Sequence, residues 1–242
     1  MNDFLTGMRY IFRGIKLLAQ PGIRLYVIVP LFVNTLLFTG VIVYGAELIS
    51  DLIRHLSQQW SWIEWIGWLL WPLFVIVALT LVFFCFSILA NLIAAPFNGF
   101  LAAAVEAKIS GTRITDDQGV SALVRELVDA IKAEGIKFIY FLVRAIPLLV
   151  LFLIPLIQAI APVIWVVFGA WMIALEYLDF PMANHGKLFP EIRKTLGEHR
   201  ALAIGFGLST LMMTMIPVVN FIAMPAAVAG ATSLWLDHIK NR

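Results

Sequence analysis

Residues 145–175 have the sequence AIPLLVLFLIPLIQAIAPVIWVVFGAWMIAL, which contains no Asp, Glu, Lys or Arg. Three more charge-free runs of at least 22 residues occupy positions 25–46, 65–105 and 201–236. Of the 242 residues, 62% are hydrophobic and 13% are charged, whereas soluble domains have about 45–50% and about 25%. A soluble globule of this size cannot bury so much apolar surface. The sequence therefore predicts an all-α integral membrane protein.

The charges between the runs predict how the chain crosses the membrane. A helix needs about 20 apolar residues to cross a hydrocarbon core of about 30 Å. The connection 47–64 holds only one Lys or Arg, Arg54, whereas the other connections hold several. Because basic residues collect on the cytoplasmic side, we expect residues 47–64 outside, a first crossing at 25–49 and a second, with an extension, at 62–105.

The last two runs must then begin and end on the cytoplasmic side. With 31 and 36 residues, they are too short for two crossings and a turn. Prolines, which break or kink helices, interrupt both runs. The sequence therefore predicts two partly penetrating helical hairpins, at 138–178 and 201–236, within a single membrane domain. The alternative is a conventional protein with six full crossings.

Two segments lie outside these runs. Residues 1–20 predict an amphipathic helix on the membrane surface, with an apolar face formed by Phe4, Leu5, Met8, Ile11, Phe12 and Ile15. Residues 106–137 are more polar and predict a cytoplasmic helical segment, with helical alternation at 120–137. The turn-rich stretch 111–119 separates this helix from the second crossing.

Enzyme signatures are missing from the sequence. It contains no His-Glu-x-x-His, Cys-x-x-Cys, Gly-x-Ser-x-Gly or phosphate-binding loop, and its one cysteine, Cys85, lies in an apolar run. We therefore predict no catalytic residues, no metal site and no cofactor. The net charge of +2 gives no reason to expect a nucleic-acid partner.

An anion site is predicted where the surface helix meets the first crossing, at Gln20-Pro21-Gly22-Ile23-Arg24-Leu25. Glycine lets the backbone approach a ligand, and the N–H groups and dipole of a helix start favour an anion. The Arg24 guanidinium adds a forked, permanently charged donor. The alternative is an ordinary helix start followed by a positive-inside arginine.

Charged residues beside the apolar runs form a second group of candidates. Arg144 lies between apolar stretches, close to Pro147, and charges at membrane depth tend to be functional. Glu106 and the pair Glu176 and Asp179 are its candidate partners along a pathway. The alternatives are that Arg144 reaches up to the headgroups and that the acidic pair caps or staples a hairpin.

Four blocks, in this order, resemble the CysZ-type sulfate permeases of bacterial inner membranes. The blocks are Pro21-Gly22-Ile23-Arg24, then AAPFNGFL at 94–101, EYLDFPMANH at 176–185, and IPVVNF at 216–221, with Met-Pro at 224–225 and Ala-Gly-Ala-Thr at 229–232 following. The resemblance covers nearly the whole chain.

The resemblance implies sulfate uptake that feeds sulfate assimilation and cysteine synthesis. It also implies a homo-oligomer in the lipid bilayer, built from two long transmembrane helices and two partly penetrating hairpins. The family's sulfate-binding turn falls here on Gly22, Ile23 and Arg24. Ile23 replaces the usual leucine, and Leu25 stands where some relatives have a second arginine.

The mechanism expected is channel-like or ion-coupled, without ATP hydrolysis. Sulfate only accepts hydrogen bonds, so a selective site offers donors and no ionised carboxylate, and residues 17–46 contain no Asp or Glu. The alternatives are a non-transporting membrane scaffold or assembly factor and, against the missing catalytic sets, an intramembrane enzyme.

Overall fold

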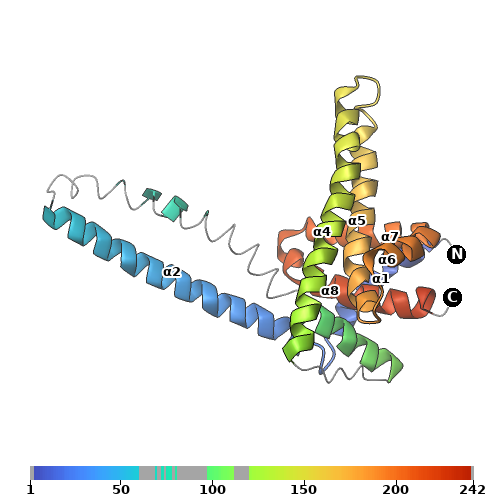
Figure 1. Ribbon diagram of the computed structural model, residues 1–242, viewed down its shortest axis with the longest axis horizontal. Coiled ribbons are helices and arrows are strands. Elements are labelled where there is room, and N and C mark those ends of the chain that lie inside the picture. The colour runs from blue at the N-terminus through green and yellow to red at the C-terminus, as the bar shows by residue number, and fades with distance from the viewer. Residues whose placement is uncertain are drawn as a thin grey trace. The chain divides into compact units, whose positions relative to one another are not determined.

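The computed structural model describes residues 3–59, 97–111 and 120–240, with a few positions between 69 and 80. Every regular element in these residues is helical (Figure 1), which confirms the all-α fold class. The helices are α1 (Asp3–Leu18), α2 (Leu25–Gln59), a helical segment at residues 97–110, α4 (Val120–Val150), α5 (Ala161–Ala183), α6 (Phe189–Glu198), α7 (Arg200–Thr214) and α8 (Pro217–Leu234), with a 3-10 turn at Leu151–Leu153 and a π-helical turn at Trp235–Ile239.

The chain divides into two compact units, Met1–Arg24 with Asn98–Arg242, and Leu25–Phe97. In the second unit, α2 continues through Pro30. Its segment Leu25–Leu48 is apolar and long enough to cross a membrane, and none of its side chains that the structure describes is buried. This segment matches the predicted first crossing at 25–49 in length and composition. Most of the predicted second crossing lies outside the described residues.

The core of the first unit forms where α1 packs against α7 and α8. The inward face of α1 consists of Gly7, Tyr10, Ile11, Gly14 and Leu17. A Cβ atom at Gly7 would collide with the Leu202 carbonyl oxygen on α7, and one at Gly14 with that of Ala226 on α8. The helices therefore meet backbone to backbone, a packing that small residues permit in membrane proteins.

The hydrophobic periodicity of the sequence predicted only one of the two apolar faces of α1. Leu5 and Phe12 are exposed, as expected for a helix at a membrane surface, but Ile11 is buried in the protein. The glycines that form the protein-facing side carry no hydrophobic signal, so the prediction missed this second face. α1 is both an amphipathic helix and a core element.

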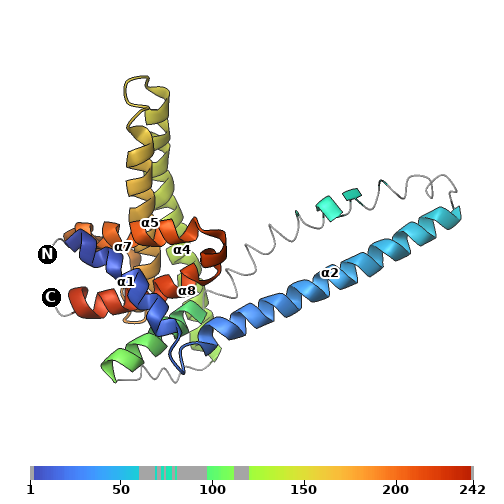
Figure 2. The ribbon, with the colours of Figure 1, turned by 180° about the vertical axis from the view of Figure 1, so that it is seen from behind.

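Two long helices, α4 and α5, form the first hairpin and lie side by side in both views (Figures 1 and 2). The connection at residues 154–160 contains Pro155, and Pro162 lies in the first turn of α5, close to the predicted tip. Pro147 does not end α4, which continues to Val150. The boundary expected between 137 and 138 falls inside this one helix.

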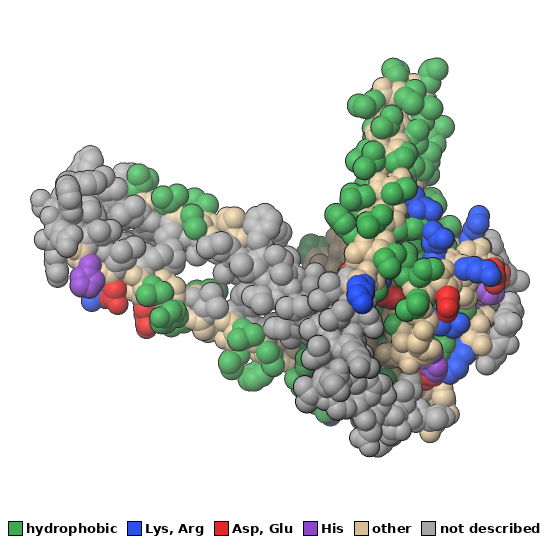
Figure 3. Space-filling model, viewed as in Figure 1, with side chains coloured by type: hydrophobic (Ala, Val, Ile, Leu, Met, Phe, Trp, Pro, Cys, Tyr) green, Lys and Arg blue, Asp and Glu red, His purple; other side chains and the backbone are tan. Residues whose placement is uncertain are grey.

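The length argument for partial penetration does not hold for this hairpin. It counted only the 31 residues between charged positions, but both helices continue past Arg144 and Glu176. The segments Lys132–Leu153 and Ala161–Ala183 have 22 and 23 residues, and each is long and apolar enough to span a membrane. Figure 3 shows the outer part of the hairpin covered with hydrophobic side chains.

The second hairpin consists of α7 and α8, with 15 and 18 residues, joined at Met215 and Ile216. At about 1.5 Å per residue, α7 is about 22 Å long, which is shorter than the hydrocarbon core. Phe206 on α7 and Leu234 on α8 are buried in one cluster with Leu178 on α5 and Leu196 on α6. This hairpin is thus largely enclosed by protein.

Candidate functional site

The predicted anion turn lies between the end of α1 and the start of α2. Gly22 has a φ of 91°, a backbone conformation that favours glycine. Ile23 is buried and Arg24 is exposed. The N–H groups of Ile23 and Arg24 donate to the Gln20 carbonyl oxygen at 3.2 and 3.3 Å.

This geometry changes which donors the turn can offer. Two of the three backbone N–H groups expected to face an anion close the turn instead. The Arg24 guanidinium forms no ion pair with any described residue and points its charge to the surface. The side chain of Arg24 and the N–H of Gly22 are therefore the donors that the turn itself retains.

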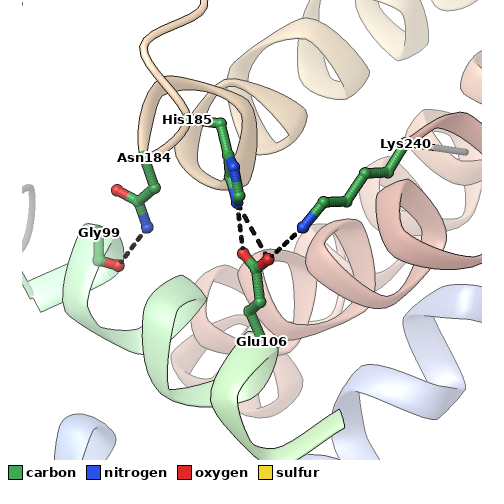
Figure 4. A network of polar contacts seen from close by, with 5 residues as sticks. All are labelled: Gly99, Glu106, Asn184, His185 and Lys240. Atoms are coloured by element: carbon green, nitrogen blue, oxygen red, sulfur yellow. Dashed lines mark hydrogen bonds and ion pairs between the residues drawn. The ribbon is translucent and has the colours of Figure 1, made fainter. Parts of the chain in front are cut away.

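Glu106 is the centre of a polar cluster that joins three segments far apart in the sequence (Figure 4). Its carboxylate oxygens lie 2.9 and 3.0 Å from Nε2 of His185, and Lys240 Nζ donates to the same carboxylate at 2.7 Å. Only 4% of the Glu106 side chain is exposed. Burying a carboxylate costs much solvation energy unless a partner compensates its charge. His185 and Lys240 are the partners of Glu106.

The backbone around the cluster sets these side chains in place. The π-helical turn Trp235–Ile239 is closed by a 2.8 Å bond from the Lys240 N–H to the Trp235 carbonyl oxygen. Asn184 Nδ2 donates to the Gly99 carbonyl oxygen at 3.0 Å and fixes the turn that carries His185. π-Helical turns often occur at functional sites.

The Trp235 side chain lies against this cluster. Its ring is 4.6 Å from the His185 ring and 4.9 Å from Lys240 Nζ. Its indole N–H is buried, and no described group accepts a hydrogen bond from it. Two donor side chains, His185 and Lys240, thus bind one carboxylate, and the Trp235 ring packs against both donors. The sequence analysis did not predict this arrangement.

Lys137 binds the other two predicted carboxylates. Its Nζ lies 2.6 Å from Asp179 and 3.3 Å from Glu176, across the α4–α5 pair, and 2.6 Å from Glu134 on its own helix. With 7% of its side chain exposed, Lys137 links the two helices of the first hairpin. The sequence analysis did not select Lys137. The i, i+3 spacing of Glu134 and Lys137 beside an apolar stretch was the available signal.

Arg144 lies apart from the carboxylates proposed as its partners. Its guanidinium stacks on the Tyr140 ring at 3.6 Å from the ring centroid, while Lys137 binds Glu176 and Asp179, and His185 and Lys240 bind Glu106. The predicted ionisable residues therefore belong to three separate places, not to one pathway cluster.

A fourth polar contact ties α1 to the π-helical turn. The Tyr10 hydroxyl donates to Asp237 at 2.8 Å, and Arg13 forms an ion pair with the same carboxylate. Burial, together with the Asp237 hydrogen bond, raises the pKa of Tyr10. Tyr10 therefore stays protonated and keeps donating at all physiological pH values.

Metal-binding groups are not assembled in the part of the chain that the structure describes. It contains no group of three or more His, Cys, Asp or Glu side chains that would hold a metal ion. The Glu106 cluster combines one carboxylate with two nitrogen donors, His185 Nε2 and Lys240 Nζ. Its chemistry is that of an ion-pair network.

Comparison with known proteins identifies the family. The family model described as Sulfate transporter CysZ/Etoposide-induced protein 2.4 matches residues 10–225. The protein named Sulfate transporter CysZ from Pectobacterium atrosepticum is 40% identical over 238 residues, which cover 98% of this chain and 86% of that protein. The range 10–225 contains the positions of Gly22, Glu106 and Lys137. The chain therefore belongs to the Sulfate transporter CysZ/Etoposide-induced protein 2.4 family.

Proposed function

We propose that this protein takes up sulfate across the bacterial inner membrane and so feeds sulfate assimilation and cysteine synthesis. The observation that carries the proposal is the 40% identity, over 98% of the chain, to a protein named as a sulfate transporter. Three described segments that are long and apolar enough to span a membrane support a multi-pass protein. Transport is channel-like or ion-coupled.

The sulfate-binding part of this proposal is the turn at Gly22, Ile23 and Arg24. An exposed arginine beside a positive-φ glycine presents a forked donor and a backbone free of side-chain bulk. Ile23 anchors the turn because its side chain is only 2% exposed. Under the predicted topology this turn lies at the cytoplasmic interface, where it serves as an exit or gating site.

The hairpins and the assembly complete the proposal. We place the tips of both hairpins inside the membrane, where neighbouring copies of a homo-oligomer cover their bare backbone. The large exposed apolar surface of α4 and α5 supports contact with lipid or with other copies. Glu106, His185 and Lys240 hold the cytoplasmic ends of the helices together.

Radiolabelled sulfate flux into proteoliposomes that contain only this protein tests the proposal. We expect uptake that exceeds the uptake of empty liposomes and is competed by unlabelled sulfate. Arg24→Ala reconstituted in equal amount should show reduced uptake, and Lys108→Ala, which removes an exposed lysine outside the turn, should not. Folded protein without any flux would favour the membrane scaffold or assembly factor instead.

A further inference from the structure

An open groove of about 870 Å³ lies where the first hairpin meets α6 and α7. Four basic side chains from three different helices line it, Arg144 on α4, Arg193 and Lys194 on α6, and Arg200 on α7. Glu198 is the only acidic side chain in its wall. Figure 3 shows Lys and Arg side chains gathered near the base of the hydrophobic hairpin.

These cations have no ion-pair partner in the part of the chain that the structure describes. Among the described residues, no carboxylate lies within ion-pairing distance of any of the four. Arg144 and Arg193 lie 3.6 and 5.4 Å from the centroid of the same Tyr140 ring, and Arg200 donates to the Gly197 carbonyl oxygen at 3.0 Å. Stacking and backbone bonds thus hold the guanidinium groups in position, while no described carboxylate forms an ion pair with them.

The part of the groove lining that lies toward the hairpin tip is apolar. It is formed by side chains of α4 and α5 that continue toward the hairpin tip, namely Pro147, Leu148, Ile164, Val167 and Phe168. Val167 is 44% exposed and its neighbour Val163 is 62% exposed. A ligand that fits the whole groove therefore needs a negative group at one end and a hydrocarbon chain at the other.

We propose that this groove binds one anionic phospholipid, with its phosphate between Arg144, Arg193 and Arg200 and an acyl chain against the α4–α5 wall. Basic pockets between membrane helices on the cytoplasmic side bind such headgroups. Free sulfate lacks the hydrocarbon part and gains nothing from the apolar wall. This lipid site is separate from the proposed sulfate turn and does not depend on it.

The lipid site also predicts how deeply the first hairpin enters the membrane. If the lipid phosphate contacts Arg144, this residue lies at the headgroup layer. The helical residues beyond it are Ala145–Leu153, which comprise the end of α4 and the 3-10 turn. At about 1.5 Å per residue, these nine residues reach about 14 Å deep, which is half of a hydrocarbon core of about 30 Å. The lipid site thus gives a physical reason for a partly penetrating hairpin that helix length alone does not supply.

Native mass spectrometry of the purified full-length protein in detergent tests the proposal. The probes are phosphatidylglycerol and phosphatidylcholine with the same acyl chains. We expect one retained phosphatidylglycerol per chain and at least about tenfold weaker retention of phosphatidylcholine. Each basic residue near a membrane surface contributes about fivefold in affinity for anionic lipid, so Arg144→Gln with Arg193→Gln should weaken retention by about 25-fold.

Matched variants separate this site from general charge effects. Lys108→Gln with Lys187→Gln removes two cations that do not line the groove, and retention should stay unchanged. Arg144→Lys keeps the charge and should lose less than Arg144→Gln. Melting temperatures within about two degrees of the parent protein are required for each comparison, and Arg200→Gln serves as the second variant if the double variant does not fold.

Several results would overturn the proposal. Equal retention of both lipids, or equal loss in the groove and control variants, removes the specific site. Displacement of phosphatidylglycerol by inorganic sulfate or phosphate at equal concentration shows an anion site that does not use the acyl chain. A wild-type protein that carries no lipid and whose groove variants change only the oligomeric state shows that another copy of the chain covers the groove.

Discussion

Glu106 is a buried carboxylate that is bound by two side chains from distant parts of the sequence. Its partners, His185 and Lys240, follow it by 79 and 134 positions in the sequence. Its position at the end of an apolar run made Glu106 a functional candidate. The sequence around residue 106 did not indicate which side chains would pair with it. The identity of a long-range partner is set by helix packing, which a single sequence does not reveal.

Glu106→Gln should destabilise the protein, because it keeps the shape of the side chain but removes the charge that His185 and Lys240 need. Breaking a buried ion pair costs about 3–5 kcal/mol, and the partial exposure of both partners reduces this to about 1–3 kcal/mol. Thermal unfolding in detergent measures the change. Glu191→Gln, an exposed carboxylate on α6, is the control and should melt like the parent protein.

Arg24→Ala should weaken sulfate binding by about 1.5–3 kcal/mol, the usual size of a charge-assisted hydrogen bond. Arg24→Lys should recover only part of this loss, because an ammonium replaces a fork of donors. Isothermal titration of the purified protein with sulfate measures both. Unchanged affinity in a folded Arg24→Ala variant would show that sulfate does not bind at this turn. An Arg24→Lys variant with the affinity of the parent protein would show that only the charge of Arg24 matters.

At the scale of elements, hydrophobicity predicted the helices of the described chain well and their packing poorly. The tip of the first hairpin was expected near Pro155–Pro162, and the structure turns at residues 154–160. The inward face of α1 was missed because Gly7 and Gly14 contribute space and not hydrophobicity. Close approach of two backbones leaves no periodic signal in the sequence.

Gly14→Ala should be destabilising, because its Cβ atom would collide with the backbone of α8 at Ala226. Overpacking of this kind costs about 1–3 kcal/mol. Gly40→Ala on α2 is the matched control: a Cβ atom there meets no described atom within 4 Å, and alanine favours a helix by up to about 1 kcal/mol. Opposite shifts in melting temperature are expected. Two equal shifts would contradict the close α1–α8 crossing.

The depth of the hairpins decides between partial penetration and six full crossings. Gln158→Cys and Met215→Cys, each in a Cys85→Ala background, place single thiols at the two tips. The helical residues beyond Arg144, the end of α4 and the 3-10 turn, reach only about 14 Å. We therefore expect a membrane-impermeant maleimide added outside intact cells to leave both thiols unmodified. Ser57→Cys, in the connection expected outside, is the positive control. Strong labelling at both tips would establish six crossings.

For the whole molecule, composition and run length were enough to predict an all-helical membrane protein, and the four sequence blocks were enough to predict its family. The placement of Arg144 beside Arg193 and Arg200 was not predictable, because α6 gave no apolar signal and its cations looked like an ordinary cytoplasmic loop. Only the fold brings these charges to the base of the first hairpin, where they form the basic end of a groove.

The same distribution of charge predicts one orientation for the whole chain. The connection 47–64 holds only Arg54, while residues 186–200 hold Lys187, Arg193, Lys194 and Arg200. Since Lys and Arg are retained on the cytoplasmic side, Ser57→Cys should be labelled from outside intact cells, and Val120→Cys should be labelled only after the membrane is permeabilised. The reverse pattern would invert the topology, and with it the side of the membrane on which Arg24 and the basic groove lie. Equal labelling of both thiols would mean that the chain inserts in two orientations, so that each face of the membrane would present copies of the same sulfate-binding turn.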